Sequence, residues 1–113
     1  MGKITKQTRI DRETARLRGL FTELDPNKLA VCEALIVRAA FITVSLQDLE
    51  KQLQLSGWVE FYQNSESQYG WKKAAAADVH ISLTKNLNAI VKQLLDLVPP
   101  AQRKSKLEEL MGT

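Results

Sequence analysis

The chain has 113 residues, of which 44% are hydrophobic and 26% charged, a balance typical of one globular domain. Its single cysteine and single histidine exclude an internal disulfide and a zinc site, which needs several ligands, and we expect no cofactor or metal. The sequence shows neither the continuous apolar region of a signal peptide nor a long apolar run of membrane-spanning length, so we expect a cytoplasmic protein that does not enter a membrane.

The net charge of +3 is concentrated at the N-terminus. Residues 1–18 carry six basic side chains against two acidic ones, whereas residues 19–113 carry ten basic and eleven acidic ones. The first residues lack hydrophobic periodicity, which predicts a basic mobile arm over residues 1–9 and a single helical domain over 10–113. Because Lys and Arg contact phosphates, we expect DNA to meet this end through Lys3, Lys6, Arg9, Arg12, Arg16 and Arg18.

Apolar residues at helical spacing predict a short helix from near Ile10 and a long helix from about 27 to 55. Asp25-Pro26 is a helix start signal, because aspartate caps free N–H groups and proline at the first position loses no hydrogen bond. Gly57 is typical of a helix end. The short helix has an apolar stripe of Leu17, Leu20, Phe21 and Leu24, with a basic opposite face. The long helix has heptad positions at Cys32, Leu35, Ala39, Ile42, Leu46, Leu49 and Leu53.

The first half of the long helix carries a second apolar set, which makes its apolar arc too wide for one partner helix. We predict that this set forms the interface of a homo-oligomer: Val37, Ala40, Phe41 and Val44. The heptad stripe itself is either the core of one chain's helical hairpin or an intermolecular coiled coil, and both arrangements can coexist.

Residues 58–71, WVEFYQNSESQYGW, predict a short β-hairpin, because aromatic and β-branched runs flank the turn-forming Asn64-Ser65-Glu66-Ser67. A second long helix of similar length is expected from about Lys73 to Pro99, followed by a final helix from 100 to 111. The apolar stripe of the second long helix consists of Ala76, Val79, Leu83, Leu87, Ile90, Leu94 and Leu97. The predicted fold is therefore all-α: an antiparallel long helical hairpin with a small β-hairpin tip and short N- and C-terminal helices.

No catalytic constellation stands out in the sequence, and we expect a protein that is not an enzyme. His80 has only Asp78 as a local carboxylate and is typical of a helix-surface or interface histidine. Cys32 lies on the heptad stripe and is predicted to be a small core residue. Nucleotide-binding and metalloprotease motifs do not occur. Five of the seven aromatic residues lie in the hairpin, where they favour packing over the stacking of nucleic-acid bases: Trp58, Phe61, Tyr62, Tyr69 and Trp71.

A second basic group lies near the C-terminus at Arg103, Lys104 and Lys106, and we expect it to assist the N-terminal residues in DNA binding. Self-association would multiply both groups, because weak phosphate contacts on several copies add through avidity.

The order of these elements resembles the small terminase subunit family of tailed phages and prophages. The resemblance covers about residues 26–107 and is most specific in LLDLVPPAQRKSKL, where Pro100 and Arg103 fit the end of the family's leucine-rich helix. Gly57 and the following WVEFY run resemble the family's hairpin between two long helices. Two segments depart from the family pattern: Gly70-Trp71-Lys72-Lys73-Ala74 stands where His-Pro-Ala is usual, and NSES replaces a glycine-rich turn.

This resemblance implies a subunit that recognises viral DNA, assembles as a ring-like homo-oligomer and presents duplex DNA to the large terminase subunit, which carries the ATPase and nuclease. A phage-encoded protein of this kind would act in the host cell cytoplasm. The residues themselves leave an alternative open, in which the chain is a helical structural or regulatory module of phage or bacterial origin that binds protein and not DNA.

Overall fold

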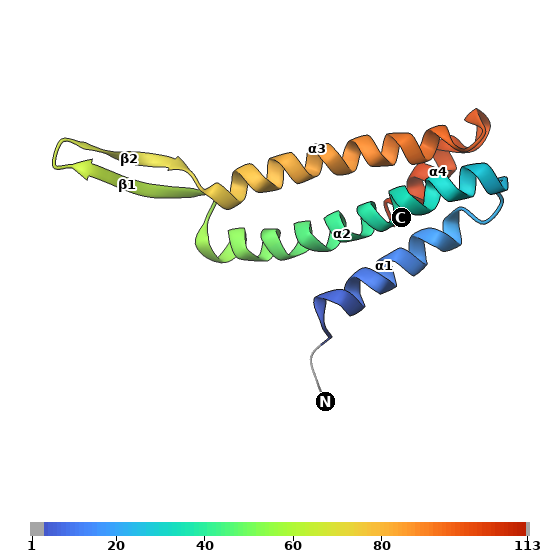
Figure 1. Ribbon diagram of the computed structural model, residues 1–113. Coiled ribbons are helices and arrows are strands. Elements are labelled where there is room, and N and C mark those ends of the chain that lie inside the picture. The colour runs from blue at the N-terminus through green and yellow to red at the C-terminus, as the bar shows by residue number, and fades with distance from the viewer. Residues whose placement is uncertain (1–3, 113) are drawn as a thin grey trace.

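The computed structural model describes residues 4–112 and is mostly helical, with a small two-stranded antiparallel sheet (Figure 1). This confirms the predicted class. Within the described residues the helices and strands are α1 Lys6–Leu20, α2 Pro26–Ser56, β1 Val59–Ser65, β2 Gln68–Lys73, α3 Ala75–Asp96, a 3₁₀ turn Pro100–Gln102 and α4 Arg103–Leu110. The chain measures 64 × 40 × 24 Å, because the two strands extend beyond the end of α2 and α3.

The long helix α2 begins and ends as the sequence predicts. The Asp25 side chain accepts a hydrogen bond from the Lys28 N–H at 3.0 Å, and Pro26 occupies the first turn. Gly57 follows the helix with φ of 85°, a conformation that costs glycine little and other residues much more.

The first helix begins at Lys6, four residues earlier than the sequence predicted. Thr5 caps it, because its hydroxyl oxygen accepts a hydrogen bond from the Thr8 N–H at 3.1 Å. A threonine cap in a segment without apolar periodicity is the signal that the prediction missed. Lys6 and Arg9 therefore belong to an ordered helix, and the proposed mobile arm over residues 1–9 is wrong for its helical part; residues 1–3, with Lys3, lie outside the described residues.

The two long helices differ in length, contrary to the prediction, with 31 residues in α2 and 22 in α3. The second is shorter because the hairpin extends further than expected: Lys73 pairs with Val59 at the base of the sheet, and the Ala74 N–H donates to the Trp58 carbonyl at 2.9 Å. The turn is also tighter than the predicted four residues, since Ser65 already pairs with Gln68. Figure 1 shows α2 and α3 side by side, with the sheet beyond the end where they are joined.

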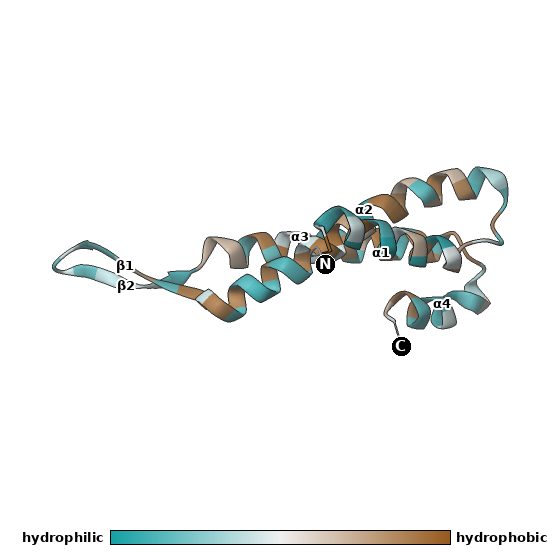
Figure 2. Ribbon diagram, turned by 90° about the horizontal axis from the view of Figure 1, so that it is seen from below, coloured by the Kyte–Doolittle hydropathy of each residue, from teal (hydrophilic) through white to brown (hydrophobic). Residues whose placement is uncertain are grey.

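The core lies at the end of the molecule away from the sheet, where α2 packs against α1 and α3, and α4 contacts α1 and α3 (Figure 2). Most of the predicted heptad positions of α2 are buried, and Ile36 joins them. In α3 only the second half of the predicted stripe is fully buried, at Ile90 and Leu94, whereas Val79 is exposed. The buried cluster consists of Leu17, Phe21, Cys32, Ile36, Ala39, Ala40, Ile42, Leu46, Ile90, Leu94, Val98 and Leu110.

By length and composition α2 could also cross a membrane, which corrects the expectation that no segment would qualify. The same property is found in core helices of soluble bundles, because a helix covered from more than one side is apolar over most of its circumference. Packing accounts for part of that composition: Cys32, Ile36 and Ala40 are buried within this chain, but only 39% of the most apolar window of α2 is buried.

A pair of leucines two residues apart tests the phase of α2. Leu53 is 0% exposed and Leu55 is 90% exposed. Leu53→Ala should lower the free energy of unfolding by about 2–5 kcal/mol, because it leaves a cavity. Leu55→Ala, the matched control, should change it by less than about 0.5 kcal/mol. Urea unfolding followed by circular dichroism measures both, and equal costs would show that the buried face of α2 is wrongly assigned.

Candidate functional site

Two basic residues predicted to bind DNA instead join α1 to α2. The Arg9 guanidinium donates to the Asp48 carboxylate at 2.6 Å and to the Gln47 side chain at 2.9 Å. Arg18, at the other end of α1, forms an ion pair with Glu33. Each arginine lowers the pKa of its carboxylate by hydrogen bonding. These two ion pairs hold α1 against α2, with the two helices antiparallel.

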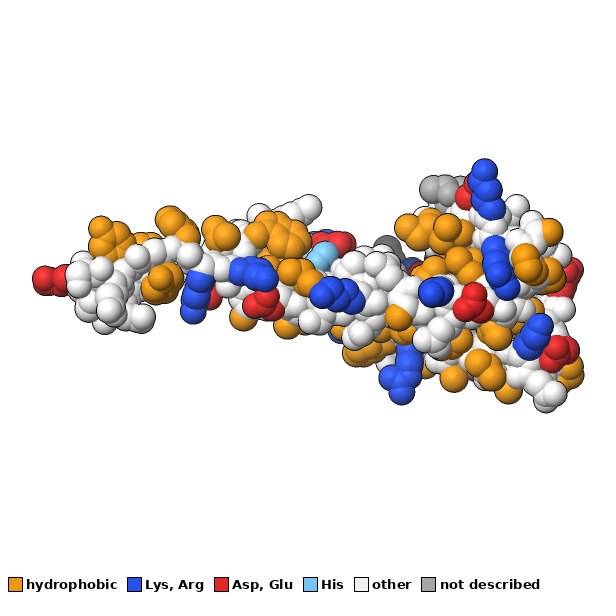
Figure 3. Space-filling view, turned by 90° about the horizontal axis from the view of Figure 1, so that it is seen from above, with side chains coloured by type: hydrophobic (Ala, Val, Ile, Leu, Met, Phe, Trp, Pro, Cys, Tyr) orange, Lys and Arg blue, Asp and Glu red, His pale blue; other side chains and the backbone are white. Residues whose placement is uncertain are grey.

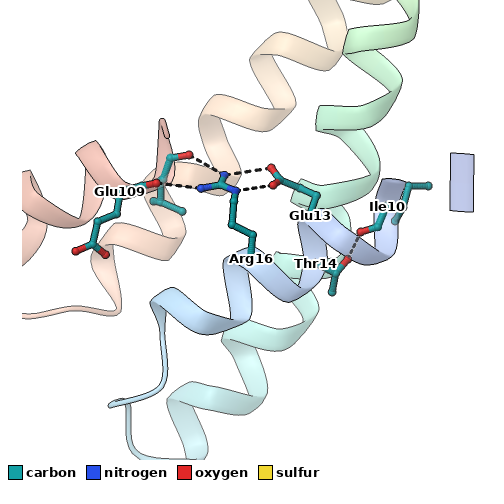
Figure 4. Close-up of polar contacts among 6 residues, drawn as sticks. Ile10, Glu13, Thr14, Arg16 and Glu109 are labelled. Atoms are coloured by element: carbon teal, nitrogen blue, oxygen red, sulfur yellow. Dashed lines mark hydrogen bonds and ion pairs between the residues drawn. The ribbon is translucent and has the colours of Figure 1, made fainter. Parts of the chain in front are cut away.

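Three further basic residues donate hydrogen bonds to backbone carbonyls at helix C-termini. Arg16 donates to the Glu109 and Leu110 carbonyls of α4, both at 3.0 Å, while Glu13 accepts from its other side (Figure 4). Arg103 Nε donates to the Leu95 and Val98 carbonyls at the end of α3, at 3.1 and 3.3 Å.

Lys106 does the same for α1, since its Nζ donates to the Leu20 carbonyl at 2.6 Å and lies 5.6 Å from the centre of the Phe21 ring. Five of the nine predicted DNA-binding side chains therefore hold the helices together. This structural role was not foreseen, because a contact between α1 and α4 joins residues that are far apart in the sequence.

The remaining predicted DNA-binding residues are less engaged. Within residues 4–112, Arg12 and Lys104 form no hydrogen bond or ion pair. Lys6 Nζ lies 5.1 Å from the centre of the Phe41 ring. Arg12 nevertheless has basic neighbours, because it lines a shallow hollow of about 290 Å³ between α1 and α2. The hollow is bordered by Arg9, Arg12, Glu13, Arg16, Val44 and Gln47.

Exposed basic residues that the sequence reasoning missed lie on the long helices. Lys85 and Lys92 are seven residues apart, which places them on one exposed face of α3, about 10 Å from each other. Helical spacing could have identified this pair. The remaining exposed cations without a described polar partner are Lys28, Arg38 and Lys51.

The predicted oligomer interface divides into two exposed and two buried residues. Val37 and Phe41 are 46% and 51% exposed, whereas Ala40 and Val44 are 0% and 2% exposed within one chain. The latter two are therefore not available to a second copy, which corrects the prediction. The reason is α1: Ala40 and Val44 share a face of α2 with Glu33 and Asp48, the residues that pair with α1.

His80 and Cys32 have the structural surroundings of packing residues. His80 Nε2 lies 3.2 Å from Glu50 of α2, and its ring meets Trp58 edge-on with centroids 5.2 Å apart. Through these contacts His80 joins both long helices to the base of the hairpin. Its carboxylate partner, Glu50, lies far from it in the sequence and could not be predicted. Cys32 is buried in the core. Among the described residues no three His, Cys, Asp or Glu side chains gather as a metal site would require.

Comparison with known proteins finds no matching family model, no matching curated protein and no matching solved structure.

The Cys32 thiol should be unreactive in the folded chain. Burial, with a smaller contribution from the Glu33 charge, raises the pKa of Cys32 to about 11. At pH 8 only about one thiol in a thousand would then be ionised, and the thiolate is the reactive form. A thiol reagent should react at least about 100-fold more slowly with the folded chain than with the chain in urea. Equal rates would contradict the burial of this face of α2.

The ion pair between Arg9 and Asp48 should make stability depend on pH. Because the pKa of Asp48 is lowered in the folded state, its carboxylate stabilises the fold above the ordinary pKa and loses that contribution as the pH falls through the lowered value. Asp48→Asn should therefore be less stable than the wild type at pH 7, by up to about 1 kcal/mol for an exposed pair, and the difference should shrink as the pH falls below the ordinary pKa of an aspartate. Asp96→Asn, which removes an unpaired carboxylate, is the control; urea midpoints at several pH values provide the measurement.

Proposed function

We propose that the protein is a non-catalytic DNA-recognition and adaptor subunit of phage genome packaging, similar to small terminase subunits, and that it acts as a homo-oligomer. Its partners would be duplex DNA and the large terminase subunit. The observation that carries the proposal is the hollow between α1 and α2, where Arg9, Arg12 and Arg16 meet. Three guanidinium groups on successive turns of one helix face are suited to phosphate oxygens, which they bind in a fork geometry.

The hollow is only partly neutralised by its own carboxylates. Arg9 and Arg16 are paired with Asp48 and Glu13, but each keeps a substantial part of its side chain exposed. Arg12 is exposed and has no described polar partner. A phosphate beside Arg12 would therefore meet one unpaired cation and the exposed sides of two more, which gives a weak contact in a single chain.

Several copies would convert this weak contact into useful affinity. Binding sites on a linked array act together, so the affinity of the assembly exceeds that of each site by orders of magnitude. Val37 and Phe41 offer exposed apolar surface for such an assembly. We infer that α2 and α3 act as an antiparallel helical hairpin, which holds the aromatic sheet away from the arginines.

Arg12 provides the most direct test of DNA binding, because its substitution breaks no described contact. Arg12→Gln should weaken binding to every duplex by about three- to tenfold and reduce the slope of log affinity against log salt concentration by about one. Fluorescence anisotropy with labelled duplexes at two salt concentrations measures both. Removal of the whole N-terminal region would be a poorer test, since Leu17 and Phe21 belong to the core.

Lys28→Gln is the matched control, because it removes one exposed positive charge near the start of α2, far from Val44 and Gln47, which border the hollow. It should leave affinity within about twofold of the wild type. If Arg12→Gln binds as the wild type does, with the same salt slope, the hollow is not the DNA site. If the wild type binds no duplex at low salt, the DNA-recognition proposal fails.

A second candidate function is an adaptor that binds protein and not DNA. It is favoured by one observation: most of the predicted phosphate-binding side chains are occupied by contacts within the chain. The absence of duplex binding by the wild type, together with a stable oligomer, would favour this candidate.

A further inference from the structure

The hairpin has one aromatic face that nothing within residues 4–112 covers. Side chains alternate between the two faces of a strand, and the register places Phe61 opposite Trp71, with Tyr69 and Val59 on the same face. These four residues, here called the aromatic face, are 52%, 71%, 62% and 54% exposed in that order. The centroid of the Phe61 ring lies 5.6 Å from that of Trp71 and 6.2 Å from that of Tyr69. The rings therefore form one continuous surface.

The opposite face of the hairpin is polar, and its side chains contact one another. Glu60 and Lys72 lie 3.6 Å apart as an ion pair, and the Tyr62 ring lies over Gly70, where an added Cβ would come within 3.3 Å of the Tyr62 hydroxyl oxygen. Gly70 thus gives Tyr62 the space to lie flat on the strand. Side chains of the polar face therefore contact one another, whereas the aromatic face is open to solvent.

An uncovered two-stranded sheet is marginally stable in water, so the aromatic face favours a partner. The three rings expose on the order of 400 Å² together, if each has a full surface of about 200 Å². That is about half of what each side contributes to a standard protein interface. One contact of this size is weak, whereas in a closed ring each chain makes two contacts, which together bury about as much surface as one standard interface.

The chain carries a complementary surface on α2. Val37, Arg38, Phe41 and Ile42 line an open depression of about 450 Å³, which is apolar except for the Arg38 guanidinium. Arg38 has no described hydrogen bond or ion pair and can lie over an aromatic ring, as Lys6 already does over Phe41. An aromatic side chain from outside would therefore find apolar walls and a cation for its ring.

The depression cannot be filled by the same chain's hairpin. Phe41 lies fifteen residues before the end of α2 at Ser56, which corresponds to about 22 Å along the helix. The hairpin extends from that end in the opposite direction, away from α1 and α4, with hydrophobic side chains gathered along it (Figure 3). Any contact between the two surfaces must therefore join different chains.

We propose that the aromatic face of one chain docks into the α2 depression of a second copy, so that the copies join head to tail. This inference rests on the homo-oligomeric part of the proposed function and identifies its contact surfaces. The chemistry of the aromatic face argues against a nucleic-acid strand as the occupant, because base stacking is normally accompanied by cations along the strand path. Lys73, the cation on this face, is paired with Asp78 at 2.8 Å.

Two charge-introducing variants of the full chain test the head-to-tail arrangement. Trp71→Glu should disable the aromatic face, and Phe41→Glu should disable the depression; both positions are exposed, so each chain should still fold, which circular dichroism and thermal melts check. By light scattering each variant should be a monomer under conditions in which the wild type assembles. A one-to-one mixture retains one intact pair of surfaces, so it should form a heterodimer of twice 12.7 kDa, but only at protein concentrations well above those at which the wild type assembles, because a single contact is weak. Val31→Glu, at another exposed site on α2, should assemble as the wild type does.

A fluorescence measurement gives independent support. Trp58→Phe leaves Trp71 as the single tryptophan and keeps an aromatic ring beside His80. The emission of Trp71 should shift to shorter wavelength as protein concentration rises, and the shift should be lost in the double variant with Phe41→Glu.

Several outcomes would overturn the docking. If Trp71→Glu is monomeric and Phe41→Glu still assembles, the aromatic faces pair with each other or with a different surface. If both variants assemble as the wild type does, or if the wild type itself stays monomeric, the aromatic face is not an interface between copies. If Trp71→Glu weakens binding of a single-stranded oligonucleotide at unchanged mass, the face is a stacking surface. Duplex binding of the same variants, measured by anisotropy, separates failure of the docking from failure of the DNA-recognition proposal.

Discussion

The wide apolar arc of α2 is the constraint on which the rest of the structure depends. A helix with buried residues on two adjoining faces needs two neighbours, and here α3 covers one face while α1 covers the other. Beyond Asp48, which pairs with Arg9 of α1, the helix that accompanies α2 within residues 4–112 is α3 (Figure 1). The molecule is therefore a packed bundle at one end and a thin pair of helices at the other. That asymmetry leaves Leu55, Val79 and the aromatic face exposed.

The contacts of the basic residues follow from the same arrangement of helices. Helix C-termini that meet in the small bundle present backbone carbonyls, and these accept hydrogen bonds from Arg16, Arg103 and Lys106. A positive charge near a helix C-terminus also interacts favourably with the helix dipole. Most of the basic side chains that the sequence assigns to DNA binding thus also make contacts that hold the bundle together. In the proposed function a polyanion would meet the hollow around Arg12, beside the parts of Arg9 and Arg16 that stay exposed.

The hairpin extends away from the helical bundle (Figure 1). Its aromatic side chains therefore lie where no helix of the bundle covers them. Strand alternation alone places three rings on one face, and the ion pair of Glu60 with Lys72 marks the other as the solvated one. In the proposed assembly the same long α2 that lacks cover at Phe41 receives the hairpin of the next chain. Self-association and exposure of the arginines would then be compatible, since the surfaces lie on different parts of the molecule.

The sequence by itself determined the features that depend on local chemistry: the helix start at Asp25-Pro26, the end at Gly57, the heptad stripe of α2 and the hairpin between two turn signals. It missed the Thr5 cap and overestimated α3, because the strand pairing of Lys73 depends on a partner fourteen residues away. Only the tertiary structure decided which side of α2 is free and which basic residues are occupied. The cover of Ala40 and Val44 and the engagement of Arg16 with α4 both require helices distant in the sequence to meet, and no local pattern encodes where such helices come to lie.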